Sequence, residues 1–258
     1  MLLLYKFLIF LTAIVVFLGF NGIFLMPSYF FVWAFIMLLF VIVSILHIFK
    51  KQNINLKDKL FFLITPIFLM CSSVLASIFL NTNLIKLLFS IGIAIMFFLY
   101  LENLFLYFRM PAKYQIYSLE NISSYINLIS IFFISSSFYG LKILLGVRFK
   151  WFIFLIAIEF FAVFILFCQN FWVNKISANE SKKYLLIAIL ILLEIYLIIL
   201  LLPSNYYVNG LIFSLAYYVI AGLIKYKLLD KLEKRIIMKY SSISFILFIF
   251  LLVTTKWT

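Results

Sequence analysis

The stretch WFIFLIAIEFFAVFILFCQNFW, residues 151–172, holds a single charged residue, Glu159, among apolar and aromatic side chains. A helix of about 20 mostly apolar residues is long enough to cross the hydrocarbon core of a bilayer. Membrane β-strands alternate in polarity over about 10 residues, and this run is too long and too continuously apolar for one. The stretch therefore predicts a transmembrane helix that carries an acid inside the membrane.

The composition of the whole chain agrees with this reading. Of its 258 residues, 68% are hydrophobic and 11% are charged, and the mean hydropathy is +1.26. Soluble domains contain about 45–50% apolar and about 25% charged residues. A soluble fold of this length could not bury so much apolar surface, and the exposed remainder would aggregate. We therefore expect an all-α, polytopic transmembrane bundle that forms one integral membrane domain over residues 1–258.

Nine stretches have the length and hydropathy of a spanning helix. The first is too long for a signal peptide and no small-residue cleavage site follows it, so we expect it to be retained. The nine predicted spans are residues 4–25, 28–49, 60–80, 84–108, 123–146, 150–173, 184–203, 206–225 and 241–257. Residues 225–240, between the last two, predict a basic amphipathic helix that lies along the membrane surface.

The basic residues indicate how the chain is oriented. The formal net charge is +13, and most of the 21 Lys and Arg residues follow the second, fourth, sixth and eighth predicted spans. The alternate connections are nearly uncharged, except near Lys142, Arg148 and Lys150. Because basic loops stay in the cytoplasm, we expect a cytoplasmic N-terminus in a bacterial inner membrane. Topology accounts for the charge, and we expect no nucleic-acid partner.

The segment 225–240 offers the densest group of cations. Lys227, Lys231, Lys234 and Arg235 fall on one face of the expected helix, opposite a face of apolar side chains. Such a helix binds anionic phospholipid headgroups of the lipid bilayer. The four cations are therefore candidates for a headgroup anchor, with a docking surface for an acidic partner as the alternative.

Two acids, Glu159 and Glu194, lie near the same depth in spans six and seven, which should be antiparallel neighbours. Ionisable groups in hydrocarbon are costly and usually face the interior of a bundle or a cavity. No Lys or Arg lies at that depth, so we expect at least one acid to be protonated. Both can be neutral groups in a packed bundle, or can bind a proton, a cation or a cationic substrate on a transport path. A basic residue from a partner subunit is a third reading, and helix rotation decides whether the acids meet.

A second group lies near the cytoplasmic end of span four. Glu102 precedes Arg109 by two helical turns and lies on about the same face, and Lys113 follows in the loop. Two cations beside an acid can hold a lipid headgroup or a substrate phosphate. The alternative is an interfacial polar cluster that reaches toward water.

Span five is the most polar of the predicted helices. Ser123, Ser130 and Ser137 recur every seven residues, and Asn127 lies on nearly the same stripe. Small hydroxyl residues permit close helix contact and interhelical hydrogen bonds. The stripe predicts either a tight internal seam or the polar lining of a cavity, which makes Asn127 a candidate ligand.

The motifs of membrane enzymes are missing from the chain. His47 is the only histidine, and neither G-x-S-x-G nor H-E-x-x-H is present. No predicted span contains an aspartate. We expect no metal and no cofactor, and catalysis is the weaker expectation.

Three functions remain open. The first is a small, permease-like transporter that uses Glu159 and Glu194 to bind a proton or cation. The second is a non-catalytic scaffold, sensor or assembly subunit whose partner docks on the basic loops. The third is a lipid-modifying enzyme working at Glu102 and Arg109. Either a homo-oligomer or a membrane partner subunit is compatible with the sequence.

Overall fold

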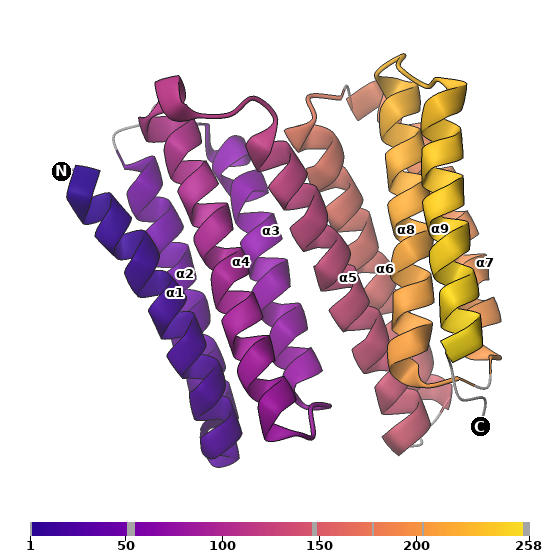
Figure 1. The fold of residues 1–258 in the computed structure, drawn as a ribbon, viewed down its shortest axis with the longest axis horizontal. Helices are drawn as coiled ribbons and strands as arrows, with labels where there is room; N and C mark the ends of the chain where they lie inside the picture. The colour runs from indigo at the N-terminus through magenta and orange to yellow at the C-terminus, as the bar shows by residue number, and fades with distance from the viewer. Residues whose placement is uncertain (1, 51–54, 146–148, 177, 203, 255–258) are drawn as a thin grey trace. The chain divides into compact units, whose positions relative to one another are not determined.

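The structure is a computed structural model that describes residues 2–50, 55–145, 149–176, 178–202 and 204–254. In these residues it contains nine α-helices, two short 3-10 helices and no strand (Figure 1). The α-helices are α1 (Leu2–Leu25), α2 (Phe30–Phe49), α3 (Leu56–Ser77), α4 (Asn83–Arg109), α5 (Ser118–Leu145), α6 (Phe149–Val173), α7 (Ala178–Leu200), α8 (Tyr206–Leu228) and α9 (Lys234–Thr254). The 3-10 helices are η1 (Pro27–Tyr29) and η2 (Pro111–Lys113). The predicted all-α bundle is confirmed.

Eight helices, α1 to α8, are long and apolar enough to cross a membrane, as far as the described residues go. Each corresponds to one of the first eight predicted spans. The ninth prediction, residues 241–257, overlaps α9, which begins earlier at Lys234, ends at Thr254 and is not among the eight. The predicted ends at 146, 203 and 255–257 lie outside the described residues. The molecule is a multi-pass membrane protein built of packed helices.

The predicted amphipathic helix over residues 225–240 is wrong. α8 continues to Leu228, a turn follows, and α9 starts at Lys234. Asp230 adopts a left-handed conformation with φ 53°, and the Lys231 N–H donates to the Tyr226 carbonyl at 3.0 Å. With the bond from the Asp230 N–H to the Lys227 carbonyl at 3.1 Å, this is a Schellman cap. Asp tolerates the left-handed region better than most residues, so the chain can turn at Asp230. α8 therefore ends inside residues 225–240, the segment for which the charge pattern predicted a single helix.

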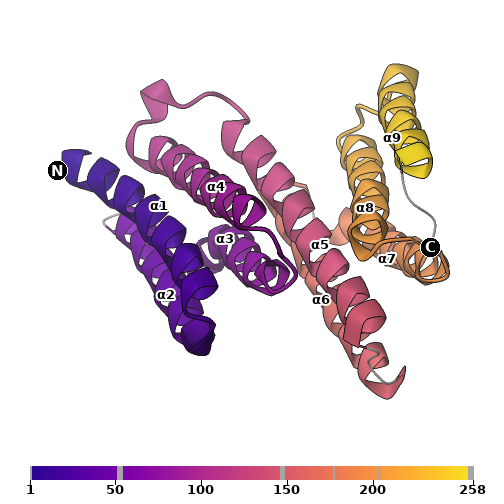
Figure 2. The same cartoon turned by 60° about the horizontal axis from the view of Figure 1, so that its bottom comes forward.

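The chain divides into two compact units, Met1–Asn127 and Leu128–Thr258, so α5 contributes to both. In the first unit α1 packs on α2 and α4, and α2 also contacts α3 and α4 (Figures 1 and 2). A buried hydrogen bond of 2.7 Å between the Thr12 and Ser44 hydroxyls links α1 to α2. In the second unit α7 packs on α6 and α8, and α9 packs on α8.

Pro66 interrupts the hydrogen bonding of α3 in the first unit. In a regular helix the Phe62 carbonyl would accept the N–H of residue 66, and proline has none. The Tyr100 hydroxyl of α4 donates to that carbonyl instead, at 2.6 Å. Tyr100 is fully buried, so the bond satisfies a backbone group where hydrocarbon could not.

We expect Tyr100→Phe to lower the unfolding free energy of the protein by about 1–3 kcal/mol, because the Phe62 carbonyl loses a donor while staying buried. Pro66→Ala should rescue Tyr100→Phe, since alanine restores the helical N–H. Thermal unfolding in detergent of the two single variants and the double variant measures this coupling. Additive losses of stability in the double variant would show that the Tyr100 hydrogen bond does not compensate for the N–H that Pro66 lacks.

Gly210 brings α8 against the backbone of α5 in the second unit. A Cβ built on Gly210 would lie 2.7 Å from the Ser136 backbone nitrogen and 2.8 Å from its Cα. Backbone atoms cannot rotate out of the way as a flexible side chain can. With Ser214 one turn later, Gly210 completes the small-residue spacing that allows close helix contact in membranes. Glycine is therefore required here to hold α5 and α8 together.

We expect Gly210→Ala to destabilise the protein by about 1–3 kcal/mol through overpacking. Gly92 in α4 is the matched control, because a Cβ there meets nothing within 4 Å. Gly92→Ala should be neutral or stabilise by up to about 1 kcal/mol, since alanine favours the helix. Melting temperatures in one detergent test the pair, and equal shifts would contradict the steric argument.

Candidate functional site: a buried carboxyl group in the second unit

Glu159 lies on the inward face of α6 and has no solvent-exposed surface. It follows Trp151, the first residue of the span, by eight positions, which places it about 12 Å from that end. Neighbouring positions on the same face are also buried, including Phe152, Val163 and Leu166. The acid is therefore enclosed among apolar side chains and does not point to lipid.

The two carboxyl oxygens of Glu159 have different surroundings. The Ser135 hydroxyl of α5 donates to Oε1 at 2.5 Å. Oε2 is buried and makes no hydrogen bond with the described residues. The Tyr196 hydroxyl interacts with the same carboxyl, yet it is also buried and lies outside hydrogen-bond geometry. One oxygen is thus held by Ser135, and the other is buried without a hydrogen bond among the described residues.

Aromatic rings from four helices meet at Tyr196, which interacts with the Glu159 carboxyl group. The Tyr196 ring of α7 stacks on the Tyr139 ring of α5, with centroids 4.6 Å apart and planes 20° apart. Phe160 of α6 and Phe213 of α8 meet Tyr196 edge-on at 5.8 Å and 5.3 Å. The Tyr139 hydroxyl donates to the Tyr196 carbonyl at 3.1 Å. These contacts hold the Tyr196 ring in place beside Glu159, which is itself fully buried.

Glu194 does not join this group. It is two residues from Tyr196, so the two side chains point about 200° apart around α7. Tyr196 is buried and Glu194 is exposed. Glu194 makes no hydrogen bond or ion pair with any described residue. The two acids that share a depth in the sequence therefore face different surroundings.

Glu102 and Arg109, the candidates for a headgroup or phosphate site, form no ion pair with each other in the described part of the first unit. Arg109 donates instead to the carbonyls of Ile48 (3.0 Å) and Lys50, and to the Tyr5 hydroxyl at 3.1 Å. Its guanidinium also lies 4.8 Å from the centre of the Tyr5 ring. A cation at the carbonyl end of α2 is favourable, so Arg109 ties α1, α2 and α4 together. Glu102 is half-buried and has no hydrogen bond within the described part of the chain.

The polar loop before α5 uses its side chains locally. The Tyr114 hydroxyl donates to Glu120 Oε2 at 2.8 Å and accepts from the Leu119 N–H at 3.0 Å. Burial raises the pKa of Tyr114, and the Glu120 carboxylate raises it further, so the hydroxyl remains a donor. Ser118 donates to the Asn103 side chain and does not cap α5. Asn127 is fully buried on α5.

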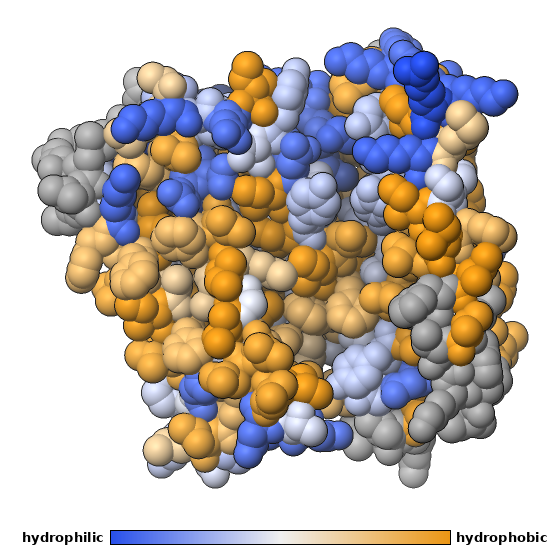
Figure 3. All heavy atoms as spheres, in the orientation of Figure 1, coloured by the Kyte–Doolittle hydropathy of each residue, from blue (hydrophilic) through white to orange (hydrophobic). Residues whose placement is uncertain are grey.

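The four candidate cations lie around the turn between α8 and α9. Lys227, Lys231, Lys234 and Arg235 are all exposed. Figure 3 shows hydrophilic side chains gathered at this end of α8 and α9, with apolar side chains further along both helices. The cations therefore lie at the turn of the α8–α9 helix hairpin. They do not form one face of a helix that lies along the membrane surface.

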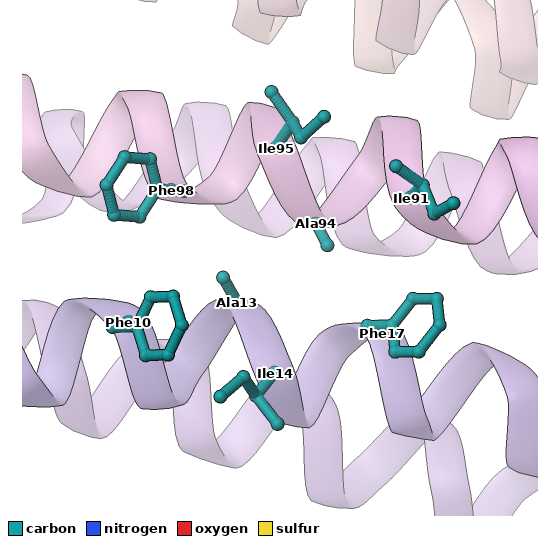
Figure 4. A pocket seen from close by; sticks show the side chains of 8 residues that line it. All are labelled: Phe10, Ala13, Ile14, Phe17, Ile91, Ala94, Ile95 and Phe98. Atoms are coloured by element: carbon teal, nitrogen blue, oxygen red, sulfur yellow. The ribbon is translucent and has the colours of Figure 1, made fainter.

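A groove in the first unit runs between α1 and α4, with a volume of about 340 Å³. Ala13 and Ala94 point toward the opposite helix and leave the space between them open (Figure 4). Every lining residue is apolar: Phe10, Ala13, Ile14, Phe17, Ile91, Ala94, Ile95 and Phe98. The groove suits hydrocarbon and offers nothing to hold a polar ligand.

Sequence reasoning missed Ser135, Tyr139 and Tyr196 as partners of Glu159. The sequence did contain a signal for the two tyrosines. Tyrosine in membrane helices favours the membrane interface, whereas Tyr139 and Tyr196 lie within predicted spans. A tyrosine inside a span needs a partner for its hydroxyl in the bundle. That requirement would have pointed to the interior faces of α5 and α7.

Comparison with known proteins finds no matching family model, no similar curated protein and no similar solved structure. In the part of the chain that the structure describes, no three His, Cys, Asp or Glu side chains gather where they could hold a metal ion. Function must therefore be argued from the geometry around Glu159.

We expect Ser135→Ala to destabilise the protein by about 1–3 kcal/mol, because a buried carboxyl oxygen loses its donor. Ser137→Ala is the matched control on the same helix, since among the described residues the Ser137 hydroxyl bonds only to the Phe133 carbonyl of α5. Placing Ser135→Ala in a Glu159→Leu background should abolish the effect. Thermal unfolding in detergent measures the cycle, and equal losses for both serine variants would refute the specific role.

Proposed function

We propose that this protein is a small membrane transporter whose second unit binds a proton or a monovalent cation at Glu159. The observation that carries the proposal is the buried Oε2 of Glu159, which has no hydrogen-bond partner among the described residues. Unsatisfied buried groups are rare in native proteins and usually mark a bound water, a bound ion or a reactive site. Carboxyl groups inside membranes commonly serve ion or proton pathways.

The chemistry of the surroundings supports a small, hard ligand. The polar groups that interact with the Glu159 carboxyl are oxygens, those of the Ser135 and Tyr196 hydroxyls. Oxygen ligands suit protons and alkali or alkaline-earth cations better than soft metals. A single carboxylate balances one positive charge, which favours a proton or a monovalent cation. Glu159 is fully buried, and surroundings of low polarity strengthen its electrostatic interaction with a bound cation.

The proposal also includes the orientation of the chain in the membrane and the membrane in which it lies. Basic residues follow the even-numbered helices, which favours a cytoplasmic N-terminus in a bacterial inner membrane. The exposed cations at the turn between α8 and α9 would then face anionic headgroups on the cytoplasmic side.

One observation favours a second function, that of a non-catalytic scaffold or assembly subunit. Lys227, Lys231, Lys234 and Arg235 are exposed together, which suits an acidic partner as well as a lipid headgroup. In that case Glu159 would be a structural residue only, and its replacement would change stability without any effect on ion movement.

A flux assay separates the two functions. Purified protein is reconstituted into liposomes that enclose a pH-sensitive dye, and a potassium diffusion potential drives proton entry; ²²Na⁺ uptake is measured in parallel. We expect the wild type to exceed empty liposomes for one of the two ions, and Glu159→Gln to reduce that flux by at least about tenfold. Glu102→Gln, another acid in a span, should leave it unchanged.

The glutamine variant keeps a carbonyl oxygen that can accept the Ser135 hydrogen bond, so folding should survive the change. Size-exclusion profiles and melting temperatures close to those of the wild type would show this. Wild-type protein that moves neither ion faster than empty liposomes would refute the proposal. So would full flux in Glu159→Gln.

A further inference from the structure

One face of α7 is apolar, exposed and regularly spaced. Its side chains are between 42% and 62% exposed, and they recur every three or four residues. They are Ile187, Leu190, Ile191, Leu197 and Ile198. Pairs seven residues apart, Leu190 with Leu197 and Ile191 with Ile198, follow the heptad spacing of helices that pack side by side. Opposite this face, Leu192 and Tyr196 are buried in the second unit.

Glu194 stands in the middle of this exposed face. Its side chain has no hydrogen bond or ion pair with the described residues, and it lies inside the span Ser181–Leu200. Hydrocarbon can neither donate to a carboxyl group nor accept from it, so an exposed acid at this depth is costly without a partner. The described residues offer Glu194 no matching polar group, so a group from a second molecule would complete this face.

We propose that this α7 face is the interface of a parallel homodimer, in which the two Glu194 carboxyl groups hydrogen-bond to each other. The twofold axis lies along the membrane normal, so both copies cross the membrane in the same direction. This symmetry places each Glu194 at the same depth as its counterpart. The two carboxyl groups share at least one proton, so that one donates and the other accepts.

A second copy is the occupant that the observations favour. A foreign helix would need its own polar group at the depth of Glu194, whereas a second copy supplies one by symmetry. A single polar residue in an apolar seam also fixes register, as buried asparagines do in coiled coils. Hydrogen bonds between such residues stabilise helix pairs in membranes. This inference does not depend on the transport function proposed for Glu159.

Disulfide cross-linking in native membranes locates the interface. In a background with Cys71 and Cys168 replaced by serine, Leu190→Cys and Leu197→Cys should give a dimer band after oxidation. Phe161→Cys on α6 is the matched control, because Phe161 is 65% exposed and lies at a similar depth. Equal cross-linking at Phe161, or none at Leu190 and Leu197, would overturn the proposal.

The role of Glu194 itself is tested by dimerisation in liposomes, measured as energy transfer between labelled copies at varied protein-to-lipid ratios. We expect Glu194→Leu to weaken the dimer by about tenfold. Glu194→Gln should retain it, because two carboxamides can also pair. Both variants should melt near the wild-type temperature, since the side chain makes no internal contact.

Two outcomes would refute the dimer. Wild-type protein that stays monomeric at every ratio would point to a different membrane protein as the occupant. An unchanged dimer in Glu194→Leu would place the interface elsewhere. Because these readouts measure association and not flux, their failure leaves the proposal for Glu159 standing, and the reverse also holds.

Discussion

Hydrocarbon supplies neither donors nor acceptors, so each polar group in the membrane must find its hydrogen-bond partner within protein. This constraint makes the chain helical, and it also explains the details. Pro66 leaves a carbonyl of α3 without its helical donor, and Tyr100 reaches from α4 to supply one. Arg109 does the same for the last carbonyls of α2. Many buried hydroxyls bond to carbonyls of their own helix, among them Ser72, Ser73, Ser77, Ser90, Ser136 and Ser137.

Against this background the exceptions carry information. Ser135 directly precedes Ser136 and Ser137, which bond within α5, yet its hydroxyl donates to Glu159 on α6. Oε2 of Glu159 and the hydroxyl of Tyr196 stay without hydrogen bonds in the interior that the structure describes. Such groups cost free energy unless a ligand or water completes them. The hydroxyls of Thr65, Ser123, Tyr217 and Ser244 also lack a hydrogen bond within the described residues, and Glu159 differs from them in carrying an ionisable carboxyl group.

Length and hydropathy were enough to predict the helices, because spanning the membrane sets a minimum length that loops rarely reach. They failed where backbone geometry decided, as at Asp230, whose left-handed conformation ends α8 within a run of lysines. Length and hydropathy also gave no information on how each helix is rotated about its own axis. Glu159 and Glu194 share a depth, and only the packing of Tyr196 against Tyr139 reveals that α7 turns Glu194 outward. Rotation depends on contacts between distant residues, which hydropathy along one helix does not contain.

If Glu159 carries an ion, the path to water is asymmetric. The acid lies about 12 Å from the Trp151 end of α6 and about 21 Å from Val173 at the other end. Along the longer route Leu166 and Phe167 are buried, and the Phe167 ring meets Tyr217 of α8 at 4.7 Å. Gln169 and Asn170 follow as buried polar residues nearer that end. An apolar layer between two polar regions is where water is most readily excluded, so the packing of Phe167 against Tyr217 would close the route on that side.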